Sequence, residues 1–179
     1  MDNHKNIKLV LGSNQKSLLP NALTIIGVCI GLCSIKFALD TRFDLAIIAI
    51  TFAAIFDGLD GRVARLIKGT SKVGKELDSL TDVISFGVAP GLILYFWTLN
   101  NLGKIGWMLV LIYTVCCALR LARFNINSEN ISETWKVNFF EGVPSPAAAG
   151  IVLIPIIINL TYFFKVPNQT FVSAVVILF

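Results

Sequence analysis

Four aspartates, Asp57, Asp60, Asp78 and Asp82, lie close together in a chain of which only 15% of the residues are charged, against roughly 25% in an average soluble domain. Acidic residues in such a chain are candidates for chemistry. Residues three and four positions apart share a face of a helix. The spacing therefore predicts that the first two aspartates lie on one helical face and the last two on another.

Each predicted acidic face also carries small and polar residues. The first face comprises Asp57, Asp60, Gly61, Ala64 and Arg65, and the second comprises Ser71, Gly74, Asp78, Asp82 and Ser85. Because a short connection joins the two helices, we expect them to be antiparallel neighbours whose carboxylates converge. Small residues beside carboxylates let a bulky group approach the backbone closely.

Converging carboxylates repel one another, and divalent cations would compensate that repulsion. Oxygen ligands without histidine or cysteine favour hard ions, so the pattern predicts Mg²⁺ or Mn²⁺ rather than zinc. Paired hard cations typically serve phosphoryl transfer. Arg65 could then clamp phosphate oxygens, and Asp82 is placed to accept a proton from an attacking hydroxyl. The alternative is a solvated loop whose acids pair with Lys68, Lys72 and Lys75.

The elements that hold these residues are strongly apolar. Hydrophobic residues make up 55% of the 179 residues and gather into long runs, and a membrane-spanning helix needs about 20 such residues. The sequence predicts an all-α fold, a polytopic membrane bundle of about six helices that forms one domain over residues 1–179. The predicted spans are Asn21–Leu39, a helix from Asp44 into the aspartate segment, Lys75–Trp97 with a kink at Pro90, Ile105–Leu121, Ser145–Phe164 and Thr170–Phe179.

Two of these spans carry a further expectation. The apolar run Leu45–Phe56 is too short to cross the hydrocarbon alone, so its helix must continue through Asp57 and Asp60, at the membrane boundary. The run Thr170–Phe179 stops in mid-span, which predicts that further helices follow Phe179.

Basic residues are unequally divided between the two sides of the predicted bundle. Eleven of the fifteen lysines and arginines fall on the side of the N-terminus and the aspartates. Since cytoplasmic loops carry the excess of basic residues, we expect that side to face the cytoplasm from the cell (inner) membrane. No basic stripe interleaved with aromatic residues is present, so we expect contact with anionic lipid headgroups and no nucleic-acid partner.

The aspartate segment resembles the signature of a known family. Asp57-x2-Asp60-Gly61-x2-Ala64-Arg65-x8-Gly74-x3-Asp78-x3-Asp82 matches without departure the motif of the CDP-alcohol phosphotransferases, which are integral membrane enzymes of phospholipid synthesis. The stretch "LPNALT" is similar to the family's opening segment, so the resemblance covers most of the chain. Within the family, "LDSLTDVISFGVAPG", "ALRLARFN" and "FFEGVPSPAAAG" are similar to the integral membrane phosphatidylserine synthases of bacteria.

The resemblance implies roles for individual residues. It implies that Asp57 and Asp78 bridge two metal ions and that Asp60 completes one metal site. Asp82 would contact the other ion and act as the general base. The implied contacts to CDP-diacylglycerol are Gly61, Arg65, Ser71, Asn21 and Thr24. The implied reaction is attack of the L-serine hydroxyl on the phosphorus that bears diacylglycerol, giving phosphatidylserine and CMP, and a homodimer is expected.

Arg120 and Arg123, near the end of the fourth predicted span, are open to two interpretations. They could bind the carboxylate of serine or a lipid phosphate, or they could anchor the helix as positive-inside charges. Asn125 and the "GVPSP" loop are acceptor-side candidates by resemblance alone.

Other functions remain open at this point. The same chemistry could use glycerol 3-phosphate or inositol phosphate as acceptor, which would call for further basic residues at the pocket. A membrane cation carrier could also use intramembrane carboxylates, but a carrier gives Gly61, Ala64 and Gly74 no evident role. Prenyl transferases normally have two acidic motifs far apart in the chain, unlike the single cluster here.

Overall fold

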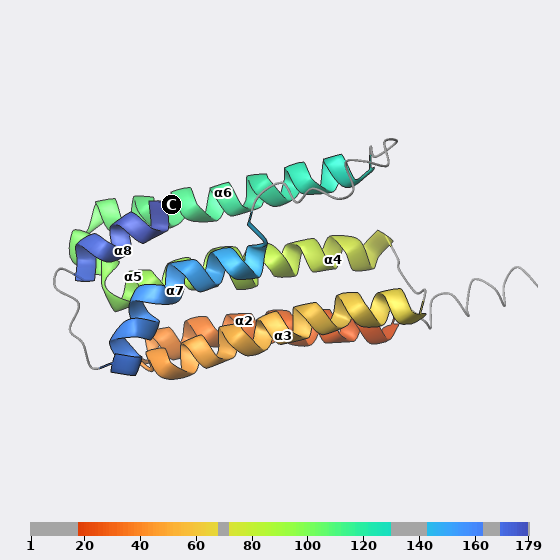
Figure 1. Cartoon of the computed structure of the whole chain (residues 1–179), viewed down its shortest axis with the longest axis horizontal. Helices are drawn as coiled ribbons and strands as arrows, with labels where there is room; N and C mark the ends of the chain where they lie inside the picture. Colours follow the sequence, from red (N-terminus) through yellow and green to blue (C-terminus); the bar gives the residue numbers. More distant parts are fainter. Residues whose placement is uncertain (1–17, 68–71, 130–142, 163–168, 179) are drawn as a thin grey trace, which may run out of the picture.

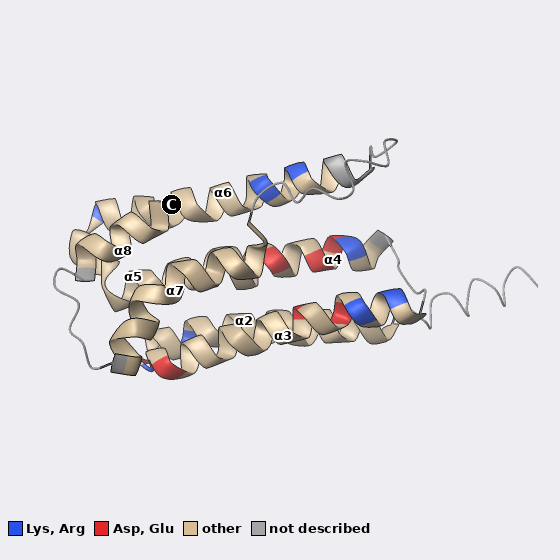
Figure 2. Cartoon of the chain, viewed as in Figure 1, with Lys and Arg blue, Asp and Glu red and all other residues tan. Residues whose placement is uncertain are grey.

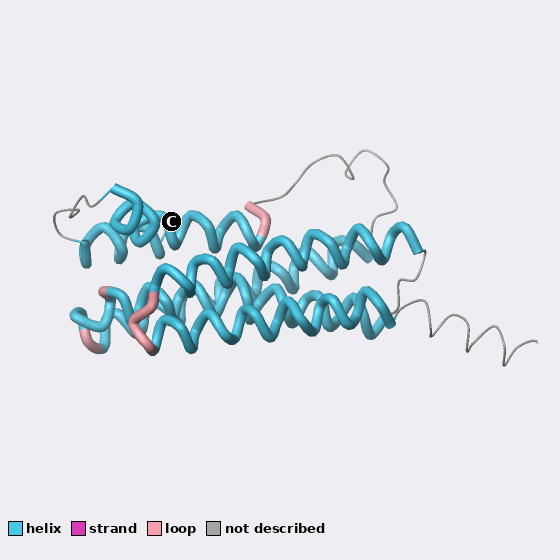
Figure 3. Tube along the Cα trace, turned by 90° about the horizontal axis from the view of Figure 1, so that it is seen from below, coloured by secondary structure: helices cyan, strands magenta, loops and turns pink. Residues whose placement is uncertain are grey.

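The computed structural model describes residues 18–67, 72–129, 143–162 and 169–178, and within these ranges every regular element is a helix (Figure 1, Figure 3). The helices are α2 (Leu18–Leu39), α3 (Phe43–Ile67), α4 (Lys72–Asp82), the π-helix η1 (Val83–Val88), α5 (Ala89–Trp97), the 3₁₀-helix η2 (Leu99–Leu102), α6 (Lys104–Glu129), α7 (Ser145–Tyr162) and α8 (Gln169–Leu178). The predicted all-helical membrane bundle is confirmed.

Three helical stretches in the described ranges are long and apolar enough to cross a membrane. They are Leu18–Leu39, Val73–Trp97 and Lys104–Ile126, and the helix Ser145–Thr161 is apolar but shorter. The helix α3 has 25 residues, and it continues through Asp57 and Asp60, as its short apolar run predicts. The run at the end of the chain forms the ten-residue helix α8.

The helix α2 packs through a face of small residues. Its buried residues are Pro20, Thr24, Gly27, Gly31, Ser34 and Ala38. Small residues four apart allow membrane helices to approach closely. A Cβ atom added at Gly31 would lie 2.9 Å from the Cβ atom of Ser85 in η1. The absence of a side chain at Gly31 is therefore what allows α2 to touch η1.

We expect Gly31→Ala to destabilise the bundle by about 1–3 kcal/mol, because the added methyl group forces α2 and η1 apart. Thermal unfolding in detergent measures the effect as a lower Tm. Gly150→Ala is the matched control, since a Cβ atom at this helical glycine meets no heavy atom within 4 Å. An equal Tm for Gly31→Ala and the unaltered chain would contradict the close approach.

The expected convergence of carboxylates from two antiparallel helices is present, and α2 supports both helices, which was not predicted. The helices α3 and α4 run in opposite directions, as expected (Figure 1), but they make little direct contact. Instead α2 packs against both of them. The small face of α2 thus acts as a common support, and the space left between α3 and α4 is where the acidic side chains lie.

The span with the predicted kink at Pro90 contains the π-helix η1, which ends at Val88, two residues before that proline. Proline has no N–H group, so Pro90 cannot donate to the carbonyl oxygen of Phe86 one turn earlier. The hydroxyl of Tyr113 on α6 donates to that oxygen instead, over 2.9 Å. The N–H of Ala89 bonds to the carbonyl oxygen of Ile84, five residues back. A π-helical segment therefore begins directly after Asp82, and α6 is tied to it.

The apolar core and the aspartate cluster lie toward different ends of the bundle. The core includes Ala38, Ile50, Ile93, Leu94, Leu99, Val110, Leu153 and Ile156. Figure 2 shows that most acidic residues of α3 and α4 gather toward the other end, together with basic residues of α3, α4 and α6, while the start of α3 carries a separate acidic residue, Asp44. Because the core packs the helices firmly at one end, the charged end can remain open between α3 and α4.

Candidate active site

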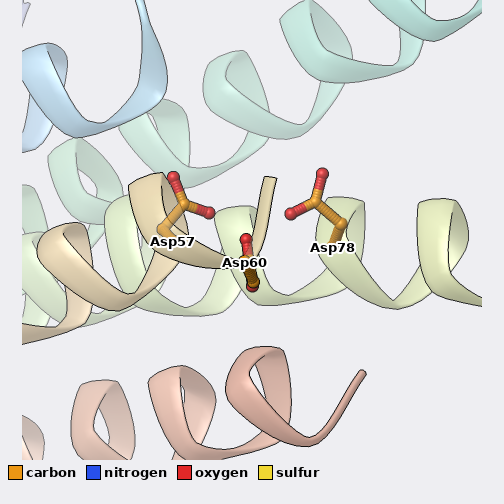
Figure 4. A group of neighbouring side chains, drawn as sticks. All are labelled: Asp57, Asp60 and Asp78. Atoms are coloured by element: carbon orange, nitrogen blue, oxygen red, sulfur yellow. The ribbon is translucent and has the colours of Figure 1, made fainter. Parts of the chain in front are cut away.

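Three aspartates from two helices converge at the charged end of the bundle. Asp57 and Asp60 come from α3 and Asp78 comes from α4, and one carboxylate oxygen of each lies within 4.8 Å of the others. Figure 4 shows the carboxyl groups of Asp57 and Asp78 directed toward each other, with Asp60 between them. Asp60 is buried, Asp57 is half-buried and Asp78 is exposed. The helical spacing thus brings these three side chains together.

Asp82 stands beside this cluster. Its carboxyl group lies within hydrogen-bonding reach of that of Asp57. When both carboxyl groups are ionised, neither has a proton with which to form a hydrogen bond to the other. Among the described residues, the buried Oδ1 of Asp82 has no hydrogen-bond partner. Its Oδ2 accepts a long hydrogen bond of 3.4 Å from the hydroxyl of Ser145, at the start of α7. Asp82 therefore keeps one oxygen available to a cation or a proton.

These observations fit a site for hard divalent ions. The donor set consists of carboxylate oxygens, which Mg²⁺ and Mn²⁺ prefer. Like charges this close repel one another unless a cation or a proton lies between them, and a buried acceptor without a partner is costly. A bound cation would remove both penalties.

A cavity of about 200 Å³ opens beside the cluster. Its lining residues are Pro20, Asn21, Thr24, Asp60, Gly61, Ala64, Arg65, Gly74, Lys75 and Asp78. Four of the five substrate contacts implied by the resemblance line it, and the fifth, Ser71, lies outside the described residues. A Cβ atom at Gly61 would meet nothing within 4 Å, so a ligand can approach the backbone there. A second hollow between α2 and α3 is lined by apolar side chains, among them Ile30 and Phe52, and by Cys33, and it contains no carboxylate.

Thr24 and Arg65 reach the site in different ways. The hydroxyl of Thr24 is 2.7 Å from Oδ2 of Asp60, so this side chain touches a carboxylate of the cluster. The Nε of Arg65 donates to the carbonyl oxygen of Gly61 over 3.0 Å, which turns the exposed guanidinium along the rim of the cavity. Lys75 lines the same cavity from α4. Its place beside Gly74, three residues before Asp78, could have indicated this position, whereas the sequence pattern predicted Lys75 only as a counter-charge and as the start of a membrane span.

The two arginines of α6 occupy different positions. Arg120 is half-buried, its Nε has no hydrogen-bond partner among the described residues, and its positive charge acts on Asp82. Arg123 is exposed. The amide of Asn125 donates to the hydroxyl of Ser79 over 2.8 Å, so it links α6 to α4. Of the "GVPSP" loop, Ser145 contacts Asp82, whereas Gly142 lies outside the described residues.

Comparison with known proteins identifies a matching family model and several related proteins. The family model of the CDP-alcohol phosphatidyltransferases matches residues 17–179. Relatives from several bacteria carry the name CDP-diacylglycerol–serine O-phosphatidyltransferase. The Mycobacterium leprae protein is 46% identical over 137 residues, which are 76% of this chain and 45% of that protein. The Helicobacter pylori (strain 26695) protein is 43% identical over 167 residues, which are 92% of this chain and 69% of that protein.

A more distant relative with the same name comes from Bacillus subtilis, at 36% identity over 144 residues, which are 80% of this chain and 76% of that protein. The chain spans about half the length of the mycobacterial relatives that it matches.

Proposed function

The chain belongs to the CDP-alcohol phosphatidyltransferase family, and we propose that it transfers a phosphatidyl group from CDP-diacylglycerol to the hydroxyl of L-serine, with release of CMP. The names of its relatives support the choice of substrates. The observation that carries the proposal is the convergence of Asp57, Asp60 and Asp78 beside Asp82. A site of this kind suits phosphoryl transfer, in which positioning and charge do most of the work.

We assign the metal ligands as the motif implies. Asp57 and Asp78 would hold both of two ions, Asp60 would complete one site, and Asp82 would contribute to the other. Mg²⁺ or Mn²⁺ bound there would neutralise charge that develops on the phosphate oxygens. Members of this family depend on divalent metal ions, and the aspartate cluster would supply the ligands.

The side chains of the protein position the reactants. Arg65 at the rim of the cavity and the open face at Gly61 would hold the diphosphate and nucleotide of CDP-diacylglycerol. Asp82, whose Oδ1 has no partner among the described residues, would take the proton of the serine hydroxyl. The serine oxygen forms a bond to the phosphorus that bears diacylglycerol. The bond from this phosphorus to the bridging oxygen breaks, and CMP leaves with the electron pair.

Arg120 is our candidate for the carboxylate of serine. Its side chain lies near Asp82 rather than on the outer surface, and a carboxylate acceptor would satisfy the buried Nε. A phosphorylated acceptor such as glycerol 3-phosphate would need additional cations near Asp82. Among the described residues of α6, Arg120 supplies one and Arg123 is exposed. Because Arg65 and Lys75 also line the cavity, the preference for serine is supported by the names of the relatives.

We expect Arg120→Gln to raise the KM for L-serine by about 10- to 100-fold, since a hydrogen bond to a charged group contributes roughly 1.5–3 kcal/mol. The KM for CDP-diacylglycerol should change less than about threefold. Steady-state kinetics in detergent micelles, with each substrate varied in turn, measure both. Arg123→Gln is the matched control and should leave both constants nearly unchanged. If neither variant changes the KM for L-serine, both arginines serve as positive-inside anchors.

The proposed acceptor is tested by incubating the purified protein with CDP-diacylglycerol and each of L-serine, glycerol 3-phosphate and inositol phosphate, and identifying the lipid product. We expect phosphatidylserine alone. Formation of another phospholipid would keep the chemistry but replace the acceptor. No lipid product with any acceptor would overturn the proposed activity.

We also propose that the protein lies in the cell (inner) membrane as a homodimer with the site facing the cytoplasm. The distribution of lysine and arginine along the sequence supports this orientation.

A further inference from the structure

Thr24 on α2 makes one of the few polar contacts between α2 and the aspartate cluster. Its side chain is 4% exposed, and its hydroxyl lies 2.7 Å from Oδ2 of Asp60, which is itself 3% exposed. A hydroxyl has one proton to donate, and a carboxylate is the strongest acceptor nearby. Thr24 therefore donates to Asp60, across 36 positions in the sequence.

The backbone of α2 fixes the position of this hydroxyl. The Oγ1 atom of Thr24 is also 3.0 Å from the carbonyl oxygen of Pro20, one turn earlier. A threonine in a helix uses the rotamers that bring Oγ1 to such a carbonyl, and its branched Cβ makes the side chain stiff. Thr24 also belongs to the buried small face of α2. The oxygen that meets Asp60 is therefore held by a packed helix.

We propose that Thr24 is a positioning residue that fixes the Asp60 carboxylate in the orientation needed to bind a divalent cation, rather than a contact to the nucleotide. The inference rests on the proposed function, because it assumes that the aspartates bind metal ions. Groups that hold metal ligands in place typically change metal affinity by 10- to 100-fold when they are removed. Although Thr24 lines the cavity, its one proton is already engaged with Asp60, so the hydroxyl has no second proton to donate to the nucleotide.

The test is direct binding of Mn²⁺ to the full chain in detergent, followed by the loss of the electron paramagnetic resonance signal of free Mn²⁺. Thr24→Val keeps the shape of the side chain and removes the hydroxyl, so we expect its Kd for Mn²⁺ to rise by about tenfold or more. Thr24→Ser keeps the hydroxyl, so we expect its Kd to stay within about threefold of the unaltered chain. At saturating Mn²⁺, the KM for CDP-diacylglycerol should be nearly the same in all three proteins.

The control is Thr51→Val on α3. The Oγ1 atom of Thr51, like that of Thr24, lies close to the carbonyl oxygen four residues before it, and Thr51 donates to this oxygen of Ile47 over 2.9 Å, but Thr51 is exposed on the outside of the bundle. Its Kd for Mn²⁺ should not change.

Three different results would contradict the inference, and each identifies a different reason. If Thr24→Val binds Mn²⁺ as the unaltered chain does but has a raised KM for CDP-diacylglycerol, Thr24 contacts the nucleotide and our inference is wrong. If Thr24→Ser binds as weakly as Thr24→Val, the hydroxyl is not the responsible group. If the unaltered chain itself binds no Mn²⁺, the proposed metal-dependent function falls, and the inference falls with it.

Discussion

Asp82→Asn should lower the rate of CMP release by about 10²- to 10⁴-fold, the range that a positioned general base contributes. Asparagine has nearly the same shape as aspartate but cannot take up the proton of the serine hydroxyl. In the structure the Oδ1 atom of Asp82 is buried without a hydrogen-bond partner among the described residues. This oxygen can therefore accept a proton or bind a cation. CMP release under saturating CDP-diacylglycerol and L-serine measures the change.

The control for this variant is Asp40→Asn. Asp40 is an exposed aspartate that forms an ion pair with Lys36 near the end of α2, far along the chain from the cluster, so its loss should leave turnover unchanged. CDP-diacylglycerol binding should be largely intact in Asp82→Asn, because three aspartates of the cluster remain. Full turnover in Asp82→Asn would remove its role as base.

Asp78→Asn should affect metal binding as well as turnover. Asp78 is the one member of the three-aspartate cluster that α4 supplies, and the substitution removes a carboxylate that both ions would share. A bound metal ion contributes several kcal/mol to the stabilisation of charge in the transition state. We therefore expect kcat/KM to fall by about 10³-fold or more. The same preparation should lose measurable Mn²⁺ binding in the resonance assay.

The two aspartate variants separate metal binding from proton transfer. Asp82→Asn should still bind Mn²⁺ through Asp57, Asp60 and Asp78, whereas Asp78→Asn should not. If Asp78→Asn retained both Mn²⁺ binding and turnover, the cluster would not be a metal site. If both variants lost Mn²⁺ binding equally, Asp82 would be a required ligand, and its role as a base would need separate evidence.

Helical periodicity was sufficient to predict the helix that holds Asp57 and Asp60 and the face that they share. The i, i+3 spacing of Asp57 and Asp60 places both on one face of a helix. The apolar run Leu45–Phe56 is too short to cross the membrane, so its helix must extend through both aspartates. Both expectations follow from 3.6 residues per turn and from the thickness of the membrane, which are local properties. The convergence with Asp78 was inferred from the short connection between the helices, and the structure brings these side chains together. Their role as metal ligands stays a prediction.

What sequence reasoning missed depends on contacts between distant segments. The hydrogen bond of Thr24 to Asp60 and the support that α2 gives to both acidic helices arise from tertiary packing, which no local pattern encodes. The difference between Arg120 and Arg123 depends on how α6 is rotated against η1. Pro90 predicted an irregular helix, but the π-helical form also needed Tyr113 to take the freed carbonyl.

The account is tested most directly by CMP release from CDP-diacylglycerol and L-serine after the purified chain has been stripped of metal ions with EDTA. We predict negligible release until Mg²⁺ or Mn²⁺ is added, saturable recovery with increasing ion concentration, and no recovery in Asp78→Asn. CMP release that proceeds at the full rate in excess EDTA would contradict the claim that the aspartates of α3 and α4 act by holding divalent ions.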